Sequence, residues 1–157
     1  MNLAQLVYVS RPAPQLTFHE VEEMVEAAAA RNRDQDITGL LLHRPGQFFT
    51  QLLEGERSAV FRLFERIAED DRHECVRLVA LRDVDSSSFP TWGMNLFFLT
   101  DERLSHLEEV GVERDFDPWS ASLEQLAELL VQLSRSPGLV RDASTLLRRL
   151  DRDRRAS

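Results

Sequence analysis

The sequence predicts an α+β fold of ferredoxin-like type, in which two helices cover one face of a sheet built in the order β-α-β-β-α-β-β. Two observations favour this fold. Segments rich in strand-forming residues alternate with two segments whose apolar residues repeat at helical spacing. Turn residues such as Pro, Gly and Ser separate the segments from one another. A pair of helices is expected to follow this unit at the C-terminus.

Five strands and two helices make up the predicted unit. The first strand ends at a Pro-rich turn, and Thr17 with Glu20 forms a capping-box pattern at the start of the first helix. Turn residues at 44–47 join the next two strands into a hairpin, and Gly55 is expected to end it. The expected strands are 3–9, 36–43, 48–54, 75–81 and 92–99, and the expected helices are 18–31 and about 60–70.

Residues 101–157 are expected to form a helical extension to a domain of residues 1–100. Two apolar stripes at helical spacing predict two short helices, the first capped by Ser120 or Ser122. The stripes are Leu123, Leu126, Leu130 and Leu133, then Val140, Ala143, Leu147 and Leu150, with Ser136-Pro137-Gly138 between them. The pair would cover the second sheet face, or read a change in the sheet and pass it to a partner, and both roles are compatible.

The composition limits the classes of protein to consider. The 157 residues include 19 basic and 27 acidic ones, and this acidic balance disfavours binding to nucleic acid or to anionic membranes. No apolar run approaches the ~20 residues of a membrane span, and the N-terminus does not resemble a signal peptide. Cys75 is the only cysteine, and the four histidines are scattered, so no metal site is predicted. We expect a cytoplasmic protein.

Common catalytic motifs are missing from the sequence. It has no GxxxxGK[ST] or GxGxxG phosphate loop, no nucleophile elbow and no HExxH pair. Acidic pairs such as Glu22-Glu23 are typical of solvated helix faces. We therefore expect that the chain is not an enzyme.

Polar side chains fall where the predicted core should be apolar. Strand alternation places Gln51 on one face with Phe49 and Leu53, and a buried amide without partners costs roughly 1–3 kcal/mol. On the first strand, Tyr8 shares a face with Leu6 and Ser10. Asn32 lies at the end of the first helix. A core tyrosine and a helix-end asparagine are common, but a core glutamine requires a hydrogen-bonding partner, whether backbone, water, tyrosine or ligand.

Several segments in order resemble the BLUF family of blue-light sensors that bind a flavin. They are residues 6–10 (LVYVS), 37–41 (ITGLL), 49–55 (FTQLLEG), 70–73 (DDRH) and 89–94 (FPTWGM). Each string alone is weak, but together they cover about residues 3–99, the whole predicted α+β unit. The helical extension is similar to those of stand-alone members in its placement only.

The resemblance implies a flavin ring between the two helices, with FAD as the expected flavin and FMN as the alternative. Asn32 should hold the polar edge of the ring, and Gln51 should bridge the ring and the Tyr8 hydroxyl. Met94 and Trp92 match the pair that exchanges proximity to this glutamine. The residues expected to contact the cofactor are Tyr8, Met24, Arg31, Asn32, Gln51, Arg66, Ile67, Asp70 and His73.

The implied function is that of a photoreceptor. Light would drive an electron and a proton from Tyr8, and after recombination Gln51 would be left rotated or tautomerised. The strand with Met94 and Trp92 would then shift, and the C-terminal helices would pass the change to a separate signalling protein. A homo-oligomer is expected, with neither nucleic acid nor membrane as a partner.

Other functions are compatible with the same order of elements. An RNA-recognition module would need a basic face and exposed aromatic residues, which the acidic balance disfavours. A ferredoxin-like enzyme lacks a catalytic set. The main alternative is a light-insensitive flavin-binding or adaptor module that assembles through its C-terminal helices.

Overall fold

A computed structural model of the protein describes residues 2–89, 93–99, 101, 108, 113, 115–135 and 141–142. Of these, the side chains of residues 18, 22, 93–95, 141 and 142 are not described. The elements in chain order are β1 (Leu3–Pro12), α1 (Phe18–Asp34), β2 (Thr38–Arg44), β3 (Phe48–Glu56), α2 (Arg57–Glu69), β4 (His73–Asp83), β5 (Gly93–Phe98), α4 (Leu123–Arg135) and β6 (Arg141–Asp142). Each predicted strand and helix of the α+β unit is present.

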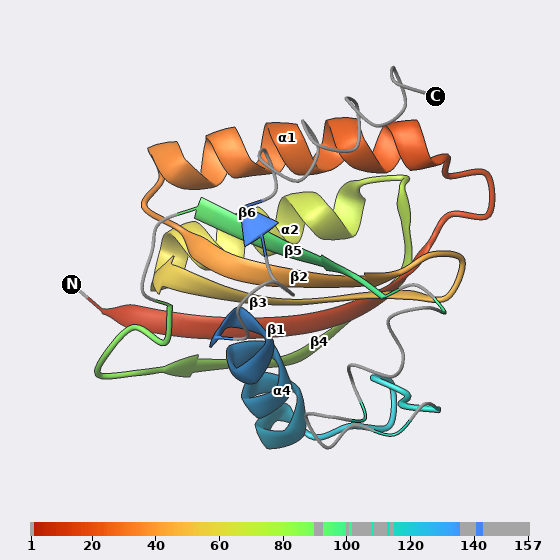
Figure 1. The fold of residues 1–157 in the computed structure, drawn as a ribbon. Helices are drawn as coiled ribbons and strands as arrows, with labels where there is room; N and C mark the ends of the chain where they lie inside the picture. The colour runs from red at the N-terminus through yellow and green to blue at the C-terminus, as the bar shows by residue number, and fades with distance from the viewer. Residues whose placement is uncertain are drawn as a thin grey trace.

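The sheet has the strand order β4-β1-β3-β2-β5-β6 (Figure 1). Its first four strands are antiparallel to their neighbours, and β5 is added beside β2 in parallel. The first four strands with two crossover helices form the ferredoxin-like arrangement, and β5 is the added fifth strand. The predicted α+β fold class is thus confirmed.

Two predicted boundaries are wrong for local reasons. The second strand begins at Thr38 rather than Asp36, because the chain first turns off the end of α1. Asp36 has a φ of 53°, and the Ile37 amide donates to the Asn32 carbonyl at 2.8 Å. Gly55 lies inside β3 instead of ending it. A Cβ at Gly55 would lie 3.2 Å from side chains of Ile37 and Val60, so the glycine permits a close approach.

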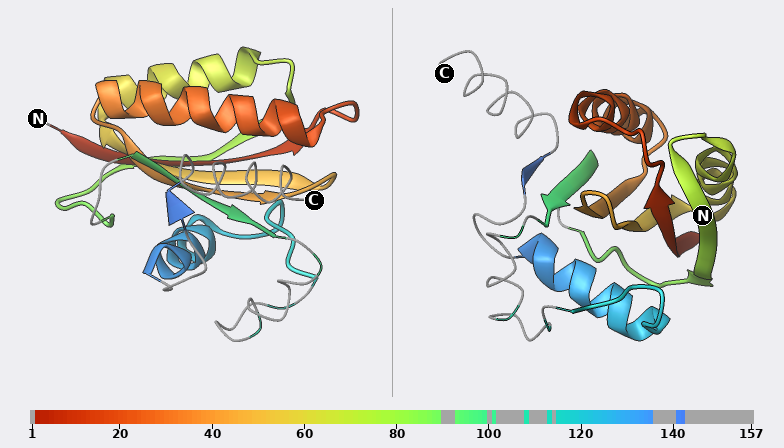
Figure 2. Two further views of the ribbon diagram at one scale, coloured as in Figure 1. Left: turned by 45° about the horizontal axis from the view of Figure 1, so that its top comes forward. Right: turned by 90° about the vertical axis from the view of Figure 1, so that its right-hand side faces the viewer.

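The helices α1 and α2 lie side by side on one face of the sheet (Figure 2). The predicted capping box of α1 is present, with the Thr17 hydroxyl accepting from the Glu20 amide and the Glu20 carboxylate accepting from the Thr17 amide. Each helix buries its own apolar cluster. The α1 cluster includes Val25 and Phe49 over β2, β3 and β5, and the α2 cluster includes Leu63 and Leu53 over β1 and β3. A seam between two clusters therefore runs along the centre of this face.

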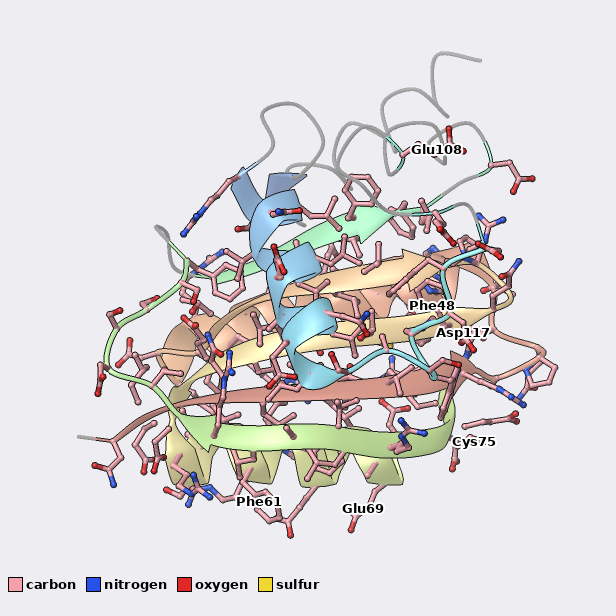
Figure 3. The ribbon with its side chains drawn as sticks, turned by 90° about the horizontal axis from the view of Figure 1, so that it is seen from below. Phe48, Phe61, Glu69, Cys75, Glu108 and Asp117 are labelled. Atoms are coloured by element: carbon pink, nitrogen blue, oxygen red, sulfur yellow. The ribbon has the colours of Figure 1, made fainter. Side chains whose placement is uncertain are left out.

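The helix α4 covers the opposite face of the sheet, where Figure 3 shows it crossing the strands. The hydroxyl of Ser122 accepts from the Gln125 amide, and Gln125 Oε1 accepts from the Ser122 amide, so Ser122 caps the helix. The predicted stripe packs on residues of β1, β2 and β3 whose side chains point away from α1 and α2, and together they form one apolar cluster. The members of this cluster from the sheet and α4 include Val7, Leu40, Leu42, Leu52, Leu126, Leu129, Leu130 and Leu133.

The prediction of a second C-terminal helix is wrong at residues 141–142. Arg141 and Asp142 form β6, whose backbone pairs with Leu96 and Asn95 of β5. A strand at these two positions is incompatible with a helix that contains Arg141 and Asp142, which fall within the predicted second stripe. The remainder of the second stripe, including Val140, lies outside the described residues.

Trp119 fixes the segment before α4 to the sheet. The guanidinium carbon of Arg11 on β1 lies 5.4 Å from the centroid of the indole ring, and that of Arg77 on β4 lies 5.8 Å from it. Arg77 also donates to the Trp119 carbonyl at 3.0 Å. Asp117 supports the turn by accepting from the Trp119 amide and the Ser120 hydroxyl. Within the part of the chain that is described, no helix is long and apolar enough to cross a membrane.

Gly39 in the ITGLL segment is required by the spacing of β2 and β3. A Cβ at this position would lie 2.4 Å from the backbone carbonyl oxygen of Leu52. We expect Gly39→Ala to lower the free energy of unfolding by about 1–3 kcal/mol, because two backbones must separate. Urea unfolding measures this, with Gly46→Ala as comparison. A Cβ at Gly46 would have no atom within 4 Å, so Gly46→Ala measures only the strain of a φ of 76°, and a larger loss there than in Gly39→Ala would contradict the prediction.

Candidate functional site between α1 and α2

Tyr8 and Gln51 are the polar pair at the centre of the seam. They lie directly opposite each other on β1 and β3, and both side chains point to the helix-covered face. The Tyr8 hydroxyl donates to Gln51 Oε1 at 2.7 Å. Tyr8 is 1% exposed and Gln51 is 2% exposed. The partner that a core glutamine requires is therefore, in part, this tyrosine.

The surroundings of Tyr8 keep its phenol protonated. Burial raises the pKa of Tyr8 well above its usual range, and the nearby negative charge of Asp70 raises it further. The ring of Phe64 lies 5.9 Å away between centroids, and the ring of His73 lies 6.1 Å away in an edge arrangement. The protonated phenol donates to the Gln51 carbonyl in this state, and the NH2 group of Gln51 points elsewhere.

A cavity of about 40 Å³ lies beside this pair, between α1 and α2. It is lined by Tyr8, Met24, Val25, Ala28, Arg31, Asn32, Leu41, Gln51, Leu63, Ile67, Asp70, Arg72 and His73. All the predicted cofactor-contacting residues are among them except Arg66. Arg66 is exposed on α2 and lines a separate, wider groove with Gln35 and Glu65. Sequence reasoning had not singled out Arg72, although it stands within the DDRH string.

Asn32 is the side chain in this cavity with unused hydrogen-bonding capacity. It is 1% exposed at the end of α1, and its Nδ2 has no hydrogen-bond partner among the described residues. A buried donor without a partner costs about 1–3 kcal/mol, and an acceptor atom of a ligand in the cavity would remove this cost. A ring carbonyl would be such an acceptor.

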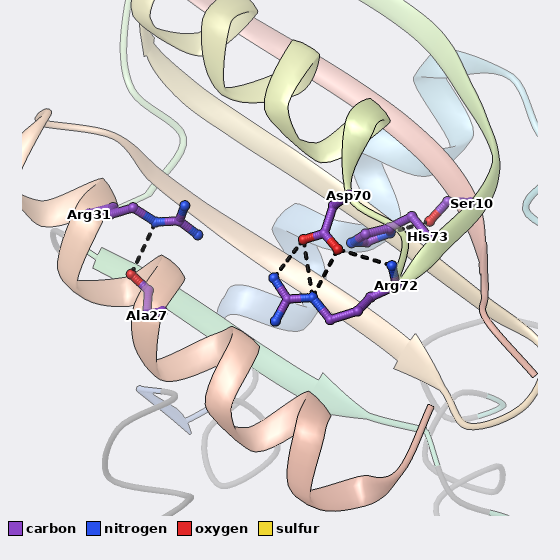
Figure 4. Close-up of polar contacts among 6 residues, drawn as sticks. All are labelled: Ser10, Ala27, Arg31, Asp70, Arg72 and His73. Carbon is purple, nitrogen blue, oxygen red and sulfur yellow. Dashed lines mark hydrogen bonds and ion pairs between the residues drawn. The ribbon is translucent and has the colours of Figure 1, made fainter. Parts of the chain in front are cut away.

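Charged groups are among the residues that line the cavity, and Figure 4 shows the polar contacts that they make. Asp70 and Arg72 form an ion pair, with Arg72 Nε 2.9 Å from Asp70 Oδ1. Hydrogen bonding from the Arg72 side chain lowers the pKa of Asp70. Nδ1 of His73 lies 2.7 Å from the Ser10 hydroxyl, and Nε of Arg31 donates to the Ala27 carbonyl. These groups could contact the polar chain of a cofactor whose ring enters the cavity.

Two histidines that are shielded from solvent make the fold sensitive to acid: His43 is buried and His73 is half-buried. Burial lowers the pKa of His43 and of His73 to about 4, from 6.5. The unfolded chain therefore binds more protons between these values, and stability is complete above pH 6.5 and falls as the pH drops toward 4. At pH 5 the loss is roughly 2 kcal/mol per histidine. Urea unfolding at pH 7 and pH 5 measures it. Equal stability at both pH values would contradict the prediction.

The predicted pair Met94 and Trp92 is only partly placed. The backbone of Met94 lies on β5 opposite Gly39 of β2, one strand further from Gln51. The side chain of Met94 and the whole of Trp92 lie outside what the structure describes. Their exchange near Gln51 stays a prediction.

The residues present fit a flavin in their chemistry. The seam offers apolar walls from Met24 and Ile67, an unpaired amide donor at Asn32 and the switchable amide of Gln51. The cavity is far smaller than the roughly 300–1,000 Å³ of typical small-molecule sites. A three-ring group therefore requires this site to widen when it binds.

A ferredoxin-like sheet whose central tyrosine–glutamine pair borders a cavity between two helices defines a flavin-based light-sensing domain. The family model described as sensors of blue light using FAD matches residues 3–95. The chain belongs to this BLUF family and is a blue-light sensor of the flavin-dependent kind.

Curated relatives include light-regulated proteins of very different lengths. The photoactivated adenylate cyclase subunit beta of Euglena gracilis is 33% identical over 84% of this chain and 14% of its own length. The blue light- and temperature-regulated antirepressor BluF of Escherichia coli K12 is 34% identical over 69% of this chain and 26% of its own length. The chain thus spans about a quarter or less of these relatives.

Solved structures of the family are similar to most of this chain. The photo-activated state of BlsA has a TM-score of 0.74 with 26% identity, and covers 85% of this chain and 96% of its own. The dark state of BlrB, a BLUF protein, has a TM-score of 0.67 with 28% identity, and the match covers 83% of this chain and 96% of BlrB.

Proposed function

We propose that the chain responds to blue light by reorienting the Gln51 amide within the Tyr8–Gln51 pair. The observation that carries the proposal is the 2.7 Å hydrogen bond from the Tyr8 hydroxyl to Gln51 Oε1, buried beside a cavity with an unpaired amide. A flavin, when bound, would supply absorption of blue light and an excited state able to accept an electron from a nearby phenol. Tyr8 is a suitable electron and proton donor because its buried phenol stays protonated.

The amide of Gln51 gives two distinguishable states. In the present state its carbonyl accepts from Tyr8. After rotation its NH2 group would donate to the Tyr8 oxygen and its carbonyl would face the opposite way, and tautomerisation would produce a similar exchange. Asn32 would hold the polar ring edge in both states, with Arg31, Asp70, Arg72 and His73 lining the same cavity.

The proposal also includes which flavin the chain binds, FAD or FMN. We favour FAD over FMN because the family is described by FAD and the cavity is lined by several charged groups that suit a longer phosphate chain. A solved structure of the relative BlrP1 contains FMN, so the comparison of both flavins is informative. Extraction and chromatography of the flavin retained during purification distinguishes them.

We further propose that residues 1–100 act as a sensor without enzymatic activity and that residues 101–157 form the output extension. The family match ends at residue 95, and α4 covers the sheet face opposite the site. The signal would pass to a separate protein, and the chain would assemble as a homo-oligomer in the cytoplasm. Mass measurement of the native protein in darkness and in light tests the assembly.

Absorption spectroscopy tests the photochemical proposal directly. We expect purified protein to be yellow and to show, under blue light, a small red shift of the flavin band that reverses in darkness. Tyr8→Phe should retain flavin and lose at least about nine-tenths of the shift, since phenylalanine cannot supply the proton. Thr50→Val removes a buried hydroxyl bonded to the Tyr8 carbonyl and should keep the shift. A flavin spectrum indifferent to light in the unmodified protein would favour the light-insensitive adaptor instead.

A further inference from the structure

A row of polar side chains crosses the α4-covered face at one end of the sheet. Arg82 on β4, Gln5 on β1 and Glu54 on β3 lie directly opposite one another in the strand register. Glu54 is 1% exposed and Gln5 is 3% exposed. A buried carboxylate is costly unless donors surround it, so this position has a specific requirement that an apolar residue would not meet.

Glu54 receives hydrogen bonds from the connection between β4 and β5. The Ser88 amide donates to Glu54 Oε1 at 2.8 Å, and the Ser87 hydroxyl donates to the same oxygen at 2.9 Å. Gln5 Nε2 donates to Glu54 Oε2 and to the Ser88 hydroxyl. The carboxylate thus binds the loop from one side and β1 from the other.

The amide of Gln5 is fixed in one orientation by its two neighbours. Arg82 donates to Gln5 Oε1 from Nε at 3.1 Å and from Nη2 at 2.9 Å, and it cannot accept. Glu54 in its ionised form only accepts, so the NH2 group of Gln5 must face it. The row from Arg82 to Glu54 therefore has one consistent arrangement of donors and acceptors.

The loop bound by Glu54 also enters the core beneath α4. Phe89 follows Ser88, is 6% exposed and packs in the same cluster as Leu52 of β3 and Leu126 of α4. The Ser87 hydroxyl accepts from the Phe89 amide at 3.2 Å. The position of Ser87 and Ser88 therefore determines how Phe89 is seated under the helix.

We propose that Glu54 is a positioning residue for signalling, which joins the strand of Gln51 to the β4–β5 loop and thereby to α4. Glu54 stands three residues after Gln51 on β3, a distance of about 10 Å along a strand. A displacement of β3 at Gln51 would reach Ser87 and Ser88 through Glu54, and reach α4 through Phe89. This route is separate from the Met94 and Trp92 strand, and it rests on the proposed light response of Gln51.

Glu54→Gln tests the proposal with little change in shape. The new NH2 group would face a donor, either Gln5 Nε2 or the Ser88 amide, and turning Gln5 over would leave Arg82 facing an NH2 group. Glu56→Gln is the matched control, because it makes the same chemical change two residues further along β3. The Glu56 carboxylate accepts hydrogen bonds from Ser58 and Ala59 at the start of α2, and no hydrogen bond joins it to the described residues of the β4–β5 loop.

Hydrogen exchange measured by mass spectrometry, with flavin bound, in darkness and in blue light, provides the readout. In the unmodified protein and in Glu56→Gln we expect light to change exchange in residues 123–135. In Glu54→Gln, hydrogen exchange in residues 123–135 should be roughly threefold to tenfold faster in darkness. The difference in exchange between light and darkness should fall by more than half. The red shift of the flavin band should keep its size in all three proteins.

The outcomes separate the two proposals. The role of Glu54 is overturned if Glu54→Gln keeps the full light-induced change in hydrogen exchange at α4 together with a normal shift of the flavin band. It is also overturned if the unmodified protein shows the flavin shift without any change in exchange at α4. A wild-type protein without the flavin shift overturns the photochemical function, and this inference with it. If Glu54→Gln does not fold, Ser87→Ala decides the question: a reduced difference at α4 supports the role, and an unchanged difference overturns it.

Discussion

Gln51→Leu is expected to retain flavin and to lose the reversible red shift completely. Leucine has nearly the shape of glutamine but has neither the carbonyl that accepts from Tyr8 nor the NH2 group that would replace it after rotation. Burial of leucine among Phe49 and Leu53 should leave the sheet intact. Absorption spectra recorded before and after blue light, at equal flavin content, measure the effect.

A loss caused by general damage to β3 has to be separated from the loss of the amide. Thr50→Val changes the neighbouring residue, whose side chain points to the α4 face, and should keep the shift. Infrared difference spectra should lack the amide bands of Gln51 in the leucine variant. A normal photocycle in Gln51→Leu would refute the assigned role of this residue.

Asn32→Leu is expected to move protein stability and flavin affinity in opposite directions. Removal of a buried Nδ2 without a partner, together with the better helix propensity of leucine, should raise the free energy of unfolding without flavin by about 1 kcal/mol. Loss of the hydrogen bond to the ring should weaken flavin binding by roughly tenfold or more. Urea unfolding of the flavin-free protein and fluorescence titration with flavin measure the two effects.

Asn32→Asp separates the contribution of the donor from that of shape. The aspartate keeps the size of the side chain but places an acceptor, or a charge, where the ring carbonyl would lie. It should weaken binding and also lower stability, because it buries an unpaired acceptor. A leucine variant that binds flavin as tightly as the unmodified protein would contradict a direct contact between Asn32 and the ring.

The sheet and its two helices were predictable because local patterns and tertiary packing agree. Period-two alternation placed Gln51 and Tyr8 on the face that the helices cover, and the structure joins them by a hydrogen bond. The capping box at Thr17 set the start of α1 correctly. Asn32 looked like an ordinary helix end in the sequence, and its burial without a partner became visible only when α1 was packed on the sheet.

Other parts of the site depend on contacts that sequence patterns do not encode. Glu54 is buried because Ser87 and Ser88 of the β4–β5 loop lie against it, and this contact between distant segments has no signal in the spacing of residues along β3. Arg72 lines the cavity and pairs with Asp70 across a tight turn. Arg66, four residues before Asp70, lines a different groove. The C-terminal strand at residues 141–142 arises from pairing with β5, which is distant in sequence.

Tyr8 is the only tyrosine in the chain. Isotopic labelling of tyrosine during growth therefore labels a single phenol, the one whose hydroxyl lies 2.7 Å from Gln51 Oε1. Every tyrosine band in an infrared difference spectrum, and every tyrosine resonance in an NMR spectrum, reports this one hydrogen bond without assignment by mutation. The strength of the bond in darkness and in light is thus directly measurable in the unmodified protein.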